Sequence, residues 1–239
     1  MKPESLRQLL DEIAAGTCAV DDALERLAAL PFSALGHSTL DTHREVRQGL
    51  PETVFGEGKT ADQLIDILTR LHQVHGRALA TRVSPEKAED VARSLLEVRY
   101  QPVARLLELG DAPTPPDRPF AVVACAGTSD LPVAEEAAGT LAFLGHRTER
   151  LTDVGVAGIH RLFDHLEVLR AAQVIISVAG MEGALTSVIG GLVATPVIGV
   201  PARVGDGVAR GGVTALRAML CSCASGVAVV NLDCGFGAA

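Results

Sequence analysis

Four runs of almost entirely apolar residues constrain the fold of this chain more than any other feature. They cover residues 120–126, 174–179, 196–200 and 227–232. A strand that alternates apolar and polar residues has one face in water, whereas a strand that is apolar throughout is buried on both faces. Helix-length segments separate the four runs, and this alternation is typical of a parallel sheet covered by helices on both sides. The second half of the chain is therefore predicted to be a doubly wound α/β domain.

The segments between these runs carry the periodicity of helices. A fifth run, residues 147–151, is half polar and fits a strand near an edge of the sheet. The sheet with its helices would form a three-layer domain of the flavodoxin or Rossmann type. The predicted helices are residues 133–143, 158–171, 183–193 and 212–223.

The charge of the chain limits its partners. A formal net charge of −8 and a pI near 5.4 make the surface repel nucleic acids and anionic lipid. Residues 1–10 include Glu4 and Arg7 instead of an apolar stretch, and no run of 18 apolar residues occurs. We therefore expect a cytoplasmic protein that binds neither nucleic acid nor membrane.

The first half of the chain has a different pattern. The first thirty residues predict a hairpin of two amphipathic helices, and residues 38–109 predict a small α/β unit with strands at 53–55 and 78–81 and helices at 61–74 and 85–96. The apolar stripes of the hairpin are formed by Leu6, Leu9, Leu10, Ile13, Ala23, Leu24, Leu27 and Leu30.

A proline-rich stretch separates the two halves. Residues 110–119 include four prolines, which exclude a helix and favour an extended backbone. We expect an N-terminal domain at 1–110, a linker at 111–119 and the main α/β domain at 120–239.

Glycine-rich loops follow three of the predicted strands. They are residues 126–130, 179–183 and 204–207, the last of which leads to Gly211 and Gly212. In an open α/β sheet such loops lie at the carboxyl edge, where helix N-termini direct N–H groups at anions. No loop has the Gly-Lys-Ser/Thr ending of a P-loop. The three loops together predict a site for a nucleotide-like anion.

The motifs of these loops resemble a known family. The C-terminal segments 127–137, 153–161, 179–184, 196–201 and 229–237 closely resemble LarB, whose C-terminal domain is similar to aminoimidazole-ribotide carboxylase. The resemblance continues in the N-terminal half, in residues 41–52, in Gly58-Lys59-Thr60 and in Thr81-Arg82.

The resemblance implies a reaction in the synthesis of the nickel-pincer nucleotide cofactor. Nicotinic acid adenine dinucleotide would be carboxylated at C5 of its pyridinium ring with carbon dioxide or bicarbonate. Its phosphoanhydride would then be hydrolysed to give pyridinium-3,5-biscarboxylic acid mononucleotide and AMP. No tightly bound cofactor is expected, and Mg²⁺ is compatible with the phosphoanhydride step. A homo-oligomer, an octamer as in the related carboxylases, is also implied.

This chemistry needs a cysteine. C5 of a pyridinium ring is not nucleophilic until a thiolate adds at a neighbouring carbon. LarB sequences have Asn-Ser-Cys-Ala where this chain has Cys221-Ser222-Cys223-Ala224, which assigns the nucleophile to Cys223. The helical pattern alone would make Cys223 a small core residue on the stripe of Leu216 and Leu220. Cys221 is therefore the alternative nucleophile.

Other residues have both a structural and a functional interpretation. Glu182 is either a first-turn carboxylate of a helix or the base that removes the C5 proton. Ser129 and Asp130 can cap the helix that follows them, bind the substrate, or do both. The resemblance implies that the substrate is bound by Gly127, Thr128, Ser129, Asp130, His160, Arg161, Gly180, Asp41, Arg44, Arg47, Lys59 and Arg82.

One loop departs from the family. LarB proteins usually have two aromatic residues where this chain has Asp206 and Arg210, which removes two candidates for stacking on the nicotinate ring. The five cysteines have neither the pairing of a disulfide framework nor the ligand spacing of a zinc site, and no metal site is expected. The alternative functions are an aminoimidazole-ribotide carboxylase or mutase and a non-catalytic nucleotide-binding module.

Overall fold

The structure is a computed structural model, and it describes residues 3–28 and 32–239. The chain forms two compact units: the first extends to residue 111 without residues 102–104, and the second contains residues 102–104 and 112–239. Among the described helices, none combines the length and the apolar character needed to cross a bilayer.

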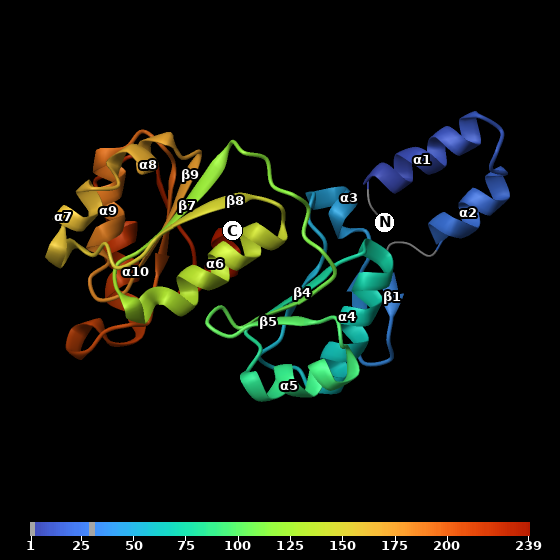
Figure 1. Ribbon diagram of the computed structural model, residues 1–239, viewed down its shortest axis with the longest axis horizontal. Coiled ribbons are helices and arrows are strands. Elements are labelled where there is room, and N and C mark those ends of the chain that lie inside the picture. Colours follow the sequence, from blue (N-terminus) through green and yellow to red (C-terminus); the bar gives the residue numbers. More distant parts are fainter. Residues whose placement is uncertain (1–2, 29–31) are drawn as a thin grey trace. The chain divides into compact units, whose positions relative to one another are not determined.

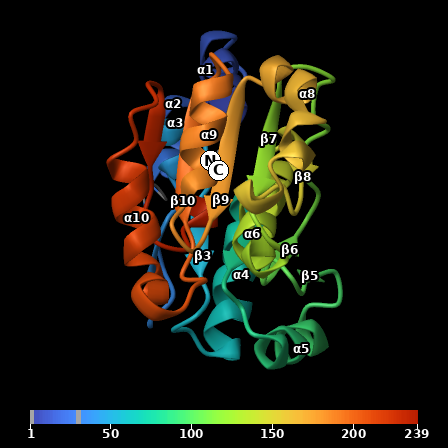
Figure 2. The same cartoon turned by 90° about the vertical axis from the view of Figure 1, so that its left-hand side faces the viewer.

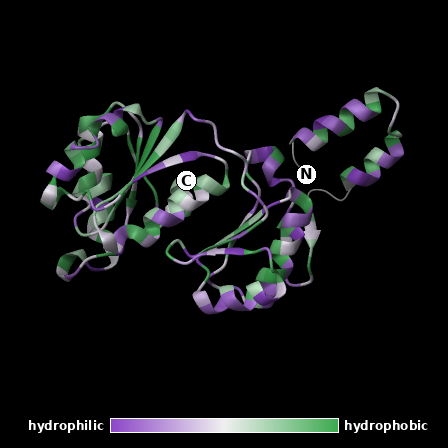
Figure 3. Cartoon of the chain, viewed as in Figure 1, coloured by the Kyte–Doolittle hydropathy of each residue, from purple (hydrophilic) through white to green (hydrophobic). Residues whose placement is uncertain are grey.

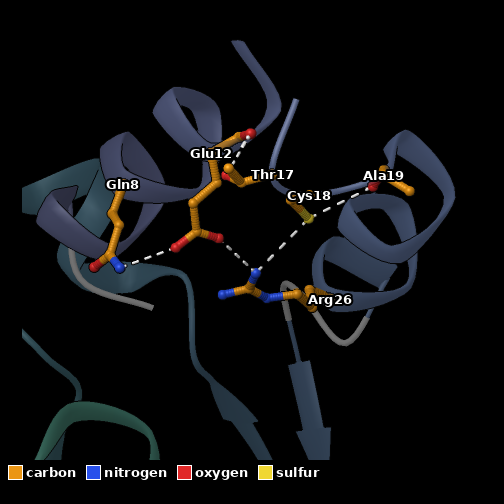
Figure 4. Close-up of polar contacts among 6 residues, drawn as sticks. All are labelled: Gln8, Glu12, Thr17, Cys18, Ala19 and Arg26. Atoms are coloured by element: carbon orange, nitrogen blue, oxygen red, sulfur yellow. Dashed lines mark hydrogen bonds and ion pairs between the residues drawn. The ribbon is translucent and has the colours of Figure 1, made fainter. Parts of the chain in front are cut away.

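Two helices begin the described chain. Helix α1 (Pro3–Ala14) and helix α2 (Val20–Ala28) are connected by a turn at Gly16, whose φ is +71°. Glu12 accepts hydrogen bonds from Gln8 Nε2 at 2.9 Å and from Arg26 Nη1 at 3.0 Å, which links the two helices (Figure 4). This pair is exposed and contributes little stability. The predicted hairpin is confirmed, while Leu30 of its apolar stripe lies outside the described residues.

The first unit contains a four-stranded mixed sheet in the order β3-β4-β6-β5 (Figure 1). Strands β3 (Thr53–Phe55) and β4 (Ala78–Thr81) are parallel, and β6 (Leu106–Leu109) is antiparallel to both β4 and β5 (Arg99–Gln101). A separate antiparallel pair is formed by β1 (Phe32–Ala34) and β2 (Thr39–Asp41).

Helices α3 (Arg44–Gln48), α4 (Ala61–His75) and α5 (Pro85–Ser94) complete this unit. Thr60 and Gln63 form a capping box at the start of α4, and Gly76 ends this helix in the left-handed conformation. The buried core joins leucines of α4 to the small residues of β4. The predicted strands and helices of this unit are thus confirmed, and the sequence pattern missed β1, β2, β5, β6 and α3.

The second unit contains a parallel sheet of five strands in the order β11-β10-β9-β7-β8. These strands are β7 (Phe120–Cys125), β8 (Arg147–Leu151), β9 (Val174–Ala179), β10 (Val197–Pro201) and β11 (Val227–Val229). The half-polar strand β8 is at an edge, as predicted, and Figure 3 shows its purple and white residues beside the green of β7.

Helices cover both faces of this sheet. Alternate residues of β7 point to opposite faces of the sheet. On one face, Val122 belongs to a core formed with four helices: α7 (His160–Phe163), α8 (Leu166–Ala171), α9 (Ala184–Leu192) and α10 (Val213–Leu220). Val123 packs with α6 (Leu131–Phe143) and α11 (Gly235–Ala238). Helices α9 and α10 are neighbours (Figure 2). The predicted three-layer doubly wound fold is therefore confirmed.

Two predicted helices are shorter than expected. The segment 158–171 is divided into a 3₁₀-helix at Val156–Gly158, α7 and α8. Helix α10 ends at Leu220, so the predicted helix over 212–223 was wrong in its last turn. The segment 207–212 before α10 is a kinked 3₁₀ turn, because Gly211 and Gly212 have φ of +80° and +78°.

Candidate functional site

A cavity of about 260 Å³ lies at the carboxyl ends of β7 and β9. The chain proceeds from β7 to β8 on one side and then to β9, β10 and β11 on the other. The order of the strands therefore reverses between β7 and β9, and ligands of open α/β sheets bind at such a crevice. The lining consists of Ala126, Gly127, Ser129, Asp130, Gly155, Val156, Ala157, Arg161, Ala179, Gly180, Met181, Glu182, Ala184, Leu185 and Val204.

Asp130 connects two loops of this cavity through hydrogen bonds. Its side chain is buried, with Oδ2 accepting the N–H of Gly127 at 2.9 Å and Oδ1 accepting the N–H of Gly180 at 3.1 Å. Burial raises the pKa of this carboxyl, the two backbone N–H groups oppose the increase, and the carboxylate of Asp233 adds to it. Asp130 makes no side-chain cap to α6, so that part of the capping interpretation was wrong.

These hydrogen bonds change the expected role of the two glycines. We predicted that Gly127 and Gly180 bind the substrate, but in this structure their N–H groups donate to Asp130. A Cβ added to Gly180 would lie 2.3 Å from the carbonyl oxygen of Val204. Likewise, a Cβ on Gly155 would lie 2.6 Å from the carbonyl oxygen of Ala126. The glycines therefore allow four loops to approach closely enough to form one cavity.

Besides Asp130, three polar side chains of the lining were predicted from the sequence. Ser129 is exposed beside the start of α6, whose N–H groups favour anions. Arg161 donates to Asp153 and to the carbonyl oxygen of Gly158 at 3.3 Å. Glu182 is exposed in the turn before α9, and no acidic residue lies in the first turn of that helix. The interpretation of Glu182 as a first-turn carboxylate was therefore wrong, whereas its place in the cavity fits contact with a ligand.

Other predicted residues of this unit do not line the cavity. Thr128 and His160 are exposed beside it, and among the described residues the lining ends at Val204. The third glycine loop thus contributes only Val204, whose carbonyl oxygen accepts the N–H of Met181 at 2.7 Å. Asp206 and Arg210 of this loop are exposed outside the lining.

Cys221 and Cys223 are exposed in the irregular segment after α10. The expectation that Cys223 lies on an apolar helical stripe was wrong, because the helix has ended before it. Ser222 between them accepts hydrogen bonds from Ser187 Oγ at 2.8 Å and from the N–H of Ala224 at 3.2 Å. This segment leads into the first residue of β11, which is parallel to β10, and so it lies at the amino edge of the sheet. The cavity is at the opposite, carboxyl edge.

The predicted residues of the N-terminal unit form local pairs. Arg47 donates to both oxygens of Asp41, at 2.6 and 3.0 Å, and the guanidinium lowers the pKa of this carboxyl. Arg44 Nε donates to Gln48 Oε1 at 3.0 Å.

Arg82 lies over the ring of Phe55 at 5.6 Å and has a φ of +54°, while the main-chain N–H of Lys59 donates to the carbonyl oxygen of Gly56. Because Gly56 also donates to the carbonyl oxygen of Thr81, Lys59 and Arg82 extend from the same end of β3 and β4.

The loop after β8 was not among the three glycine-rich loops predicted to form the site, although segment 153–161 was part of the family resemblance. Gly155, Val156 and Ala157 line the cavity, whereas the polar residues of this loop, Thr152 and Asp153, are not part of the lining. In the described parts of the chain, no group of three or more His, Cys, Asp or Glu side chains is arranged to hold a metal ion.

Replacing Asp130 with asparagine is expected to remove a pH dependence of stability. A carboxyl whose pKa is raised in the folded state stabilises the fold below its unfolded pKa, and this contribution disappears as the pH rises through the folded pKa. Asparagine does not titrate, and its side chain has one acceptor oxygen instead of two. One of the two glycine N–H groups would therefore lose its partner, and Asp130→Asn should lower the free energy of unfolding by about 1–3 kcal/mol. Denaturant titrations from about pH 4 to 7 measure both effects.

The exposed Asp164 provides the matched control. Asp164→Asn should leave both the stability and its pH dependence close to those of the wild type. An Asp130→Asn profile parallel to that of the wild type would contradict the role assigned to this carboxyl.

Comparisons with known proteins agree with the two units. Residues 32–111 match the family described as a LarB/PurE-like N-terminal domain. Residues 121–239 match the family described as AIR carboxylase, where AIR stands for aminoimidazole ribotide. An uncharacterized protein of Methanocaldococcus jannaschii is 39% identical over 244 residues, which cover 98% of this chain and 94% of that protein.

A solved structure of a PurE2 variant from Treponema denticola is 21% identical, with a TM-score of 0.42 over 51% of this chain and 76% of that one. The fold, the two matched domains and the full-length relative lead to one conclusion: this chain belongs to the LarB family, whose architecture is related to the carboxylases of AIR.

Proposed function

We propose that the protein carboxylates C5 of the pyridinium ring of nicotinic acid adenine dinucleotide and hydrolyses its phosphoanhydride. The products are pyridinium-3,5-biscarboxylic acid mononucleotide and AMP. The observation that carries this proposal is the LarB/PurE-like N-terminal domain ahead of a carboxylase domain. A carboxylase that acted on a small ribotide alone would have no evident need for the first unit. We also place this reaction in the cytoplasm.

The ring needs activation before it can react with carbon dioxide. The Cys223 thiolate would add to a ring carbon next to C5, which converts the cationic ring into a neutral enamine with electron density at C5. C5 then attacks the carbon of carbon dioxide and forms the new C–C bond. Loss of the C5 proton to a base and departure of the thiolate restore the aromatic ring. The exposure of Cys223 supports this role, because a buried thiol could not reach a ligand.

The cavity residues suit the remaining tasks. Glu182 is an exposed carboxylate of the lining and would accept the C5 proton. Ser129, Thr128 and the guanidinium of Arg161 would hold a phosphate at the start of α6, with His160 beside them. The first unit would bind the adenylate half of the substrate through Asp41, Arg44, Arg47, Lys59 and Arg82. Mg²⁺ would enter with the phosphates of the substrate, without a tightly bound cofactor.

The size of the cavity indicates that it binds only part of this substrate. Its volume of about 260 Å³ is below the range of about 300–1,000 Å³ for pockets that enclose a drug-sized ligand. The lining ends at Val204 among the described residues, so Cys223 is not part of it. We therefore infer that the complete site combines the glycine loops of one copy with Cys223 of a neighbouring copy in a homo-oligomer, an octamer by analogy with the related carboxylases.

Exposed apolar side chains support an oligomer. Met181 lines the cavity and is 49% exposed, and three further apolar residues of the second unit are exposed at 94%, 44% and 65%. They are Val208, Val213 and Leu220. Exposed apolar side chains of this size become buried where copies of a chain associate.

Subunit mixing tests the shared site. Cys223→Ser and Glu182→Gln should each be inactive, whereas an oligomer co-expressed from both variants should recover about a quarter of the wild-type turnover, since half of the copies carry each intact residue. The measurement is the rate of product formation by the doubly tagged, co-purified oligomer. A co-purified oligomer without turnover would contradict the shared site.

An AIR carboxylase or mutase is the second candidate, because residues 121–239 match that family. Incubation with ¹⁴C-bicarbonate and either substrate separates the two functions. We expect the label in a pyridinium dicarboxylate when nicotinic acid adenine dinucleotide is supplied. Label only in the ribotide would favour the second candidate, and binding of the dinucleotide without incorporation would favour a non-catalytic module.

A further inference from the structure

Two thiols lie next to each other in the segment between α10 and β11. Cys221 and Cys223 are both exposed, and a single residue separates them. Of the other cysteines, Cys125 is buried and its pKa is raised by burial, while Cys18 and Cys234 are partly covered. Oxidants react first with accessible thiols, so the pair is the expected target of oxidation in this chain.

The backbone allows the two sulfur atoms to meet. Consecutive Cα atoms are about 3.8 Å apart, so the Cα atoms of Cys221 and Cys223 lie within about 7.6 Å of each other. A disulfide requires a Cα separation of about 4.4–6.8 Å. Cys221 has φ −95° and ψ +10° at the end of α10, and neither helix nor strand includes the next residues. A small bend of this segment is therefore sufficient.

The residue between the two cysteines has a partner of its own. Ser222 lies against α9, where Ser187 donates to its hydroxyl at 2.8 Å. The cysteines on either side of it are both exposed. Both thiols are therefore accessible to an oxidant.

We propose that Cys221 and Cys223 form a reversible intramolecular disulfide that switches the protein off under peroxide stress. The Cys223 thiolate attacks one oxygen of hydrogen peroxide, releases hydroxide and becomes a sulfenic acid. The Cys221 thiol then attacks this sulfur, forms the S–S bond and releases water. One peroxide and two thiols thus give one disulfide and two waters, and a dithiol reductant restores both thiols.

The consequence for activity rests on the proposed function. A Cys223 sulfur held in a disulfide cannot add to the ring, so turnover should fall in proportion to the oxidised fraction. The disulfide also protects Cys223 from irreversible oxidation to the sulfinic acid. Exposed disulfides and strained disulfides are easily reduced, which suits a switch rather than a structural bond.

Mass spectrometry of the full-length protein tests the proposal without reference to its activity. Wild type is treated with hydrogen peroxide, alkylated with iodoacetamide and digested with Asp-N, which cleaves before Asp206 and Asp233 and so separates the pair from Cys234. The peptide with both cysteines should lack two hydrogens and carry no alkyl group, and dithiothreitol before alkylation should give two alkylations. Cys221→Asn, which introduces the residue of LarB sequences, should instead show Cys223 as a sulfinic acid. Cys18→Ser is the control and should behave as the wild type.

The outcomes separate the two proposals. A wild-type peptide with two alkylated cysteines after peroxide, or a disulfide between two chains on a non-reducing gel, would overturn the switch. If the intramolecular disulfide forms and turnover is lost and then recovered with dithiothreitol, the switch and the proposed function both hold. If it forms in a protein that carboxylates no pyridinium substrate, the thiol pair stands and the proposed function fails.

Discussion

Cys223→Ser is expected to lower the turnover of nicotinic acid adenine dinucleotide by about 1,000-fold or more, because removal of a covalent nucleophile eliminates the step that activates the substrate. A serine hydroxyl has the size of the thiol but does not ionise near neutral pH, so it cannot add to the pyridinium ring. Since the side chain is exposed and outside the helix, the fold should be unaffected. Steady-state kinetics and thermal unfolding measure the two quantities.

Cys221→Asn is the matched control in the same segment. Its turnover should remain close to that of the wild type under reducing conditions, because Cys223 and the hydrogen bonds of Ser222 are retained. The opposite ranking, with an active Cys223→Ser and an inactive Cys221→Asn, would reassign the nucleophile to Cys221.

Gly180→Ala is expected to reduce both stability and activity. The added Cβ would lie 2.3 Å from the carbonyl oxygen of Val204, and a backbone atom cannot move aside without shifting its loop. Overpacking of this kind costs about 1–3 kcal/mol. A displacement of about 1 Å in a site can cost about 100-fold in kcat/KM, because the reacting groups lose their alignment. Denaturant unfolding and steady-state kinetics measure these effects.

Gly191→Ala tests whether any added methyl group would have the same effect. Gly191 is exposed near the end of α9, and a Cβ there meets no atom within 4 Å. Alanine is favoured over glycine in a helix by about 0.5–1 kcal/mol, so this variant should be slightly more stable and fully active. Equal effects of the two substitutions would show that the contact with Val204 is not important.

The parallel sheet was predictable because its strands are buried on both faces. The apolar run that begins at Phe120 gives β7, and the half-polar run at 147–151 gives the edge strand β8. The edge of the sheet that carries the site followed from the glycine loops after β7 and β9. These features are local in the sequence, so a pattern of residue types was sufficient to find them.

Contacts between distant residues were not predictable. Asp130 is fifty positions before Gly180, and its use of the glycine N–H groups depends on how closely two loops approach. The end of α10 was also mispredicted, because Cys223 continues the apolar spacing of Leu216 and Leu220 beyond the point where the helix stops. The small unit 32–111 was found only in part, since its short strands have too few residues to show a periodicity.

Hydrogen exchange at C5 of the ring tests the thiol mechanism most directly. In D₂O without carbon dioxide, the enamine formed by the Cys223 thiolate should take up deuterium at C5 and then release the unlabelled substrate proton. NMR of recovered nicotinic acid adenine dinucleotide is expected to show deuterium at C5 with the wild type and none with Cys223→Ser. Equal exchange with a Cys221→Ser, Cys223→Ser double variant would contradict the activation of the ring by sulfur.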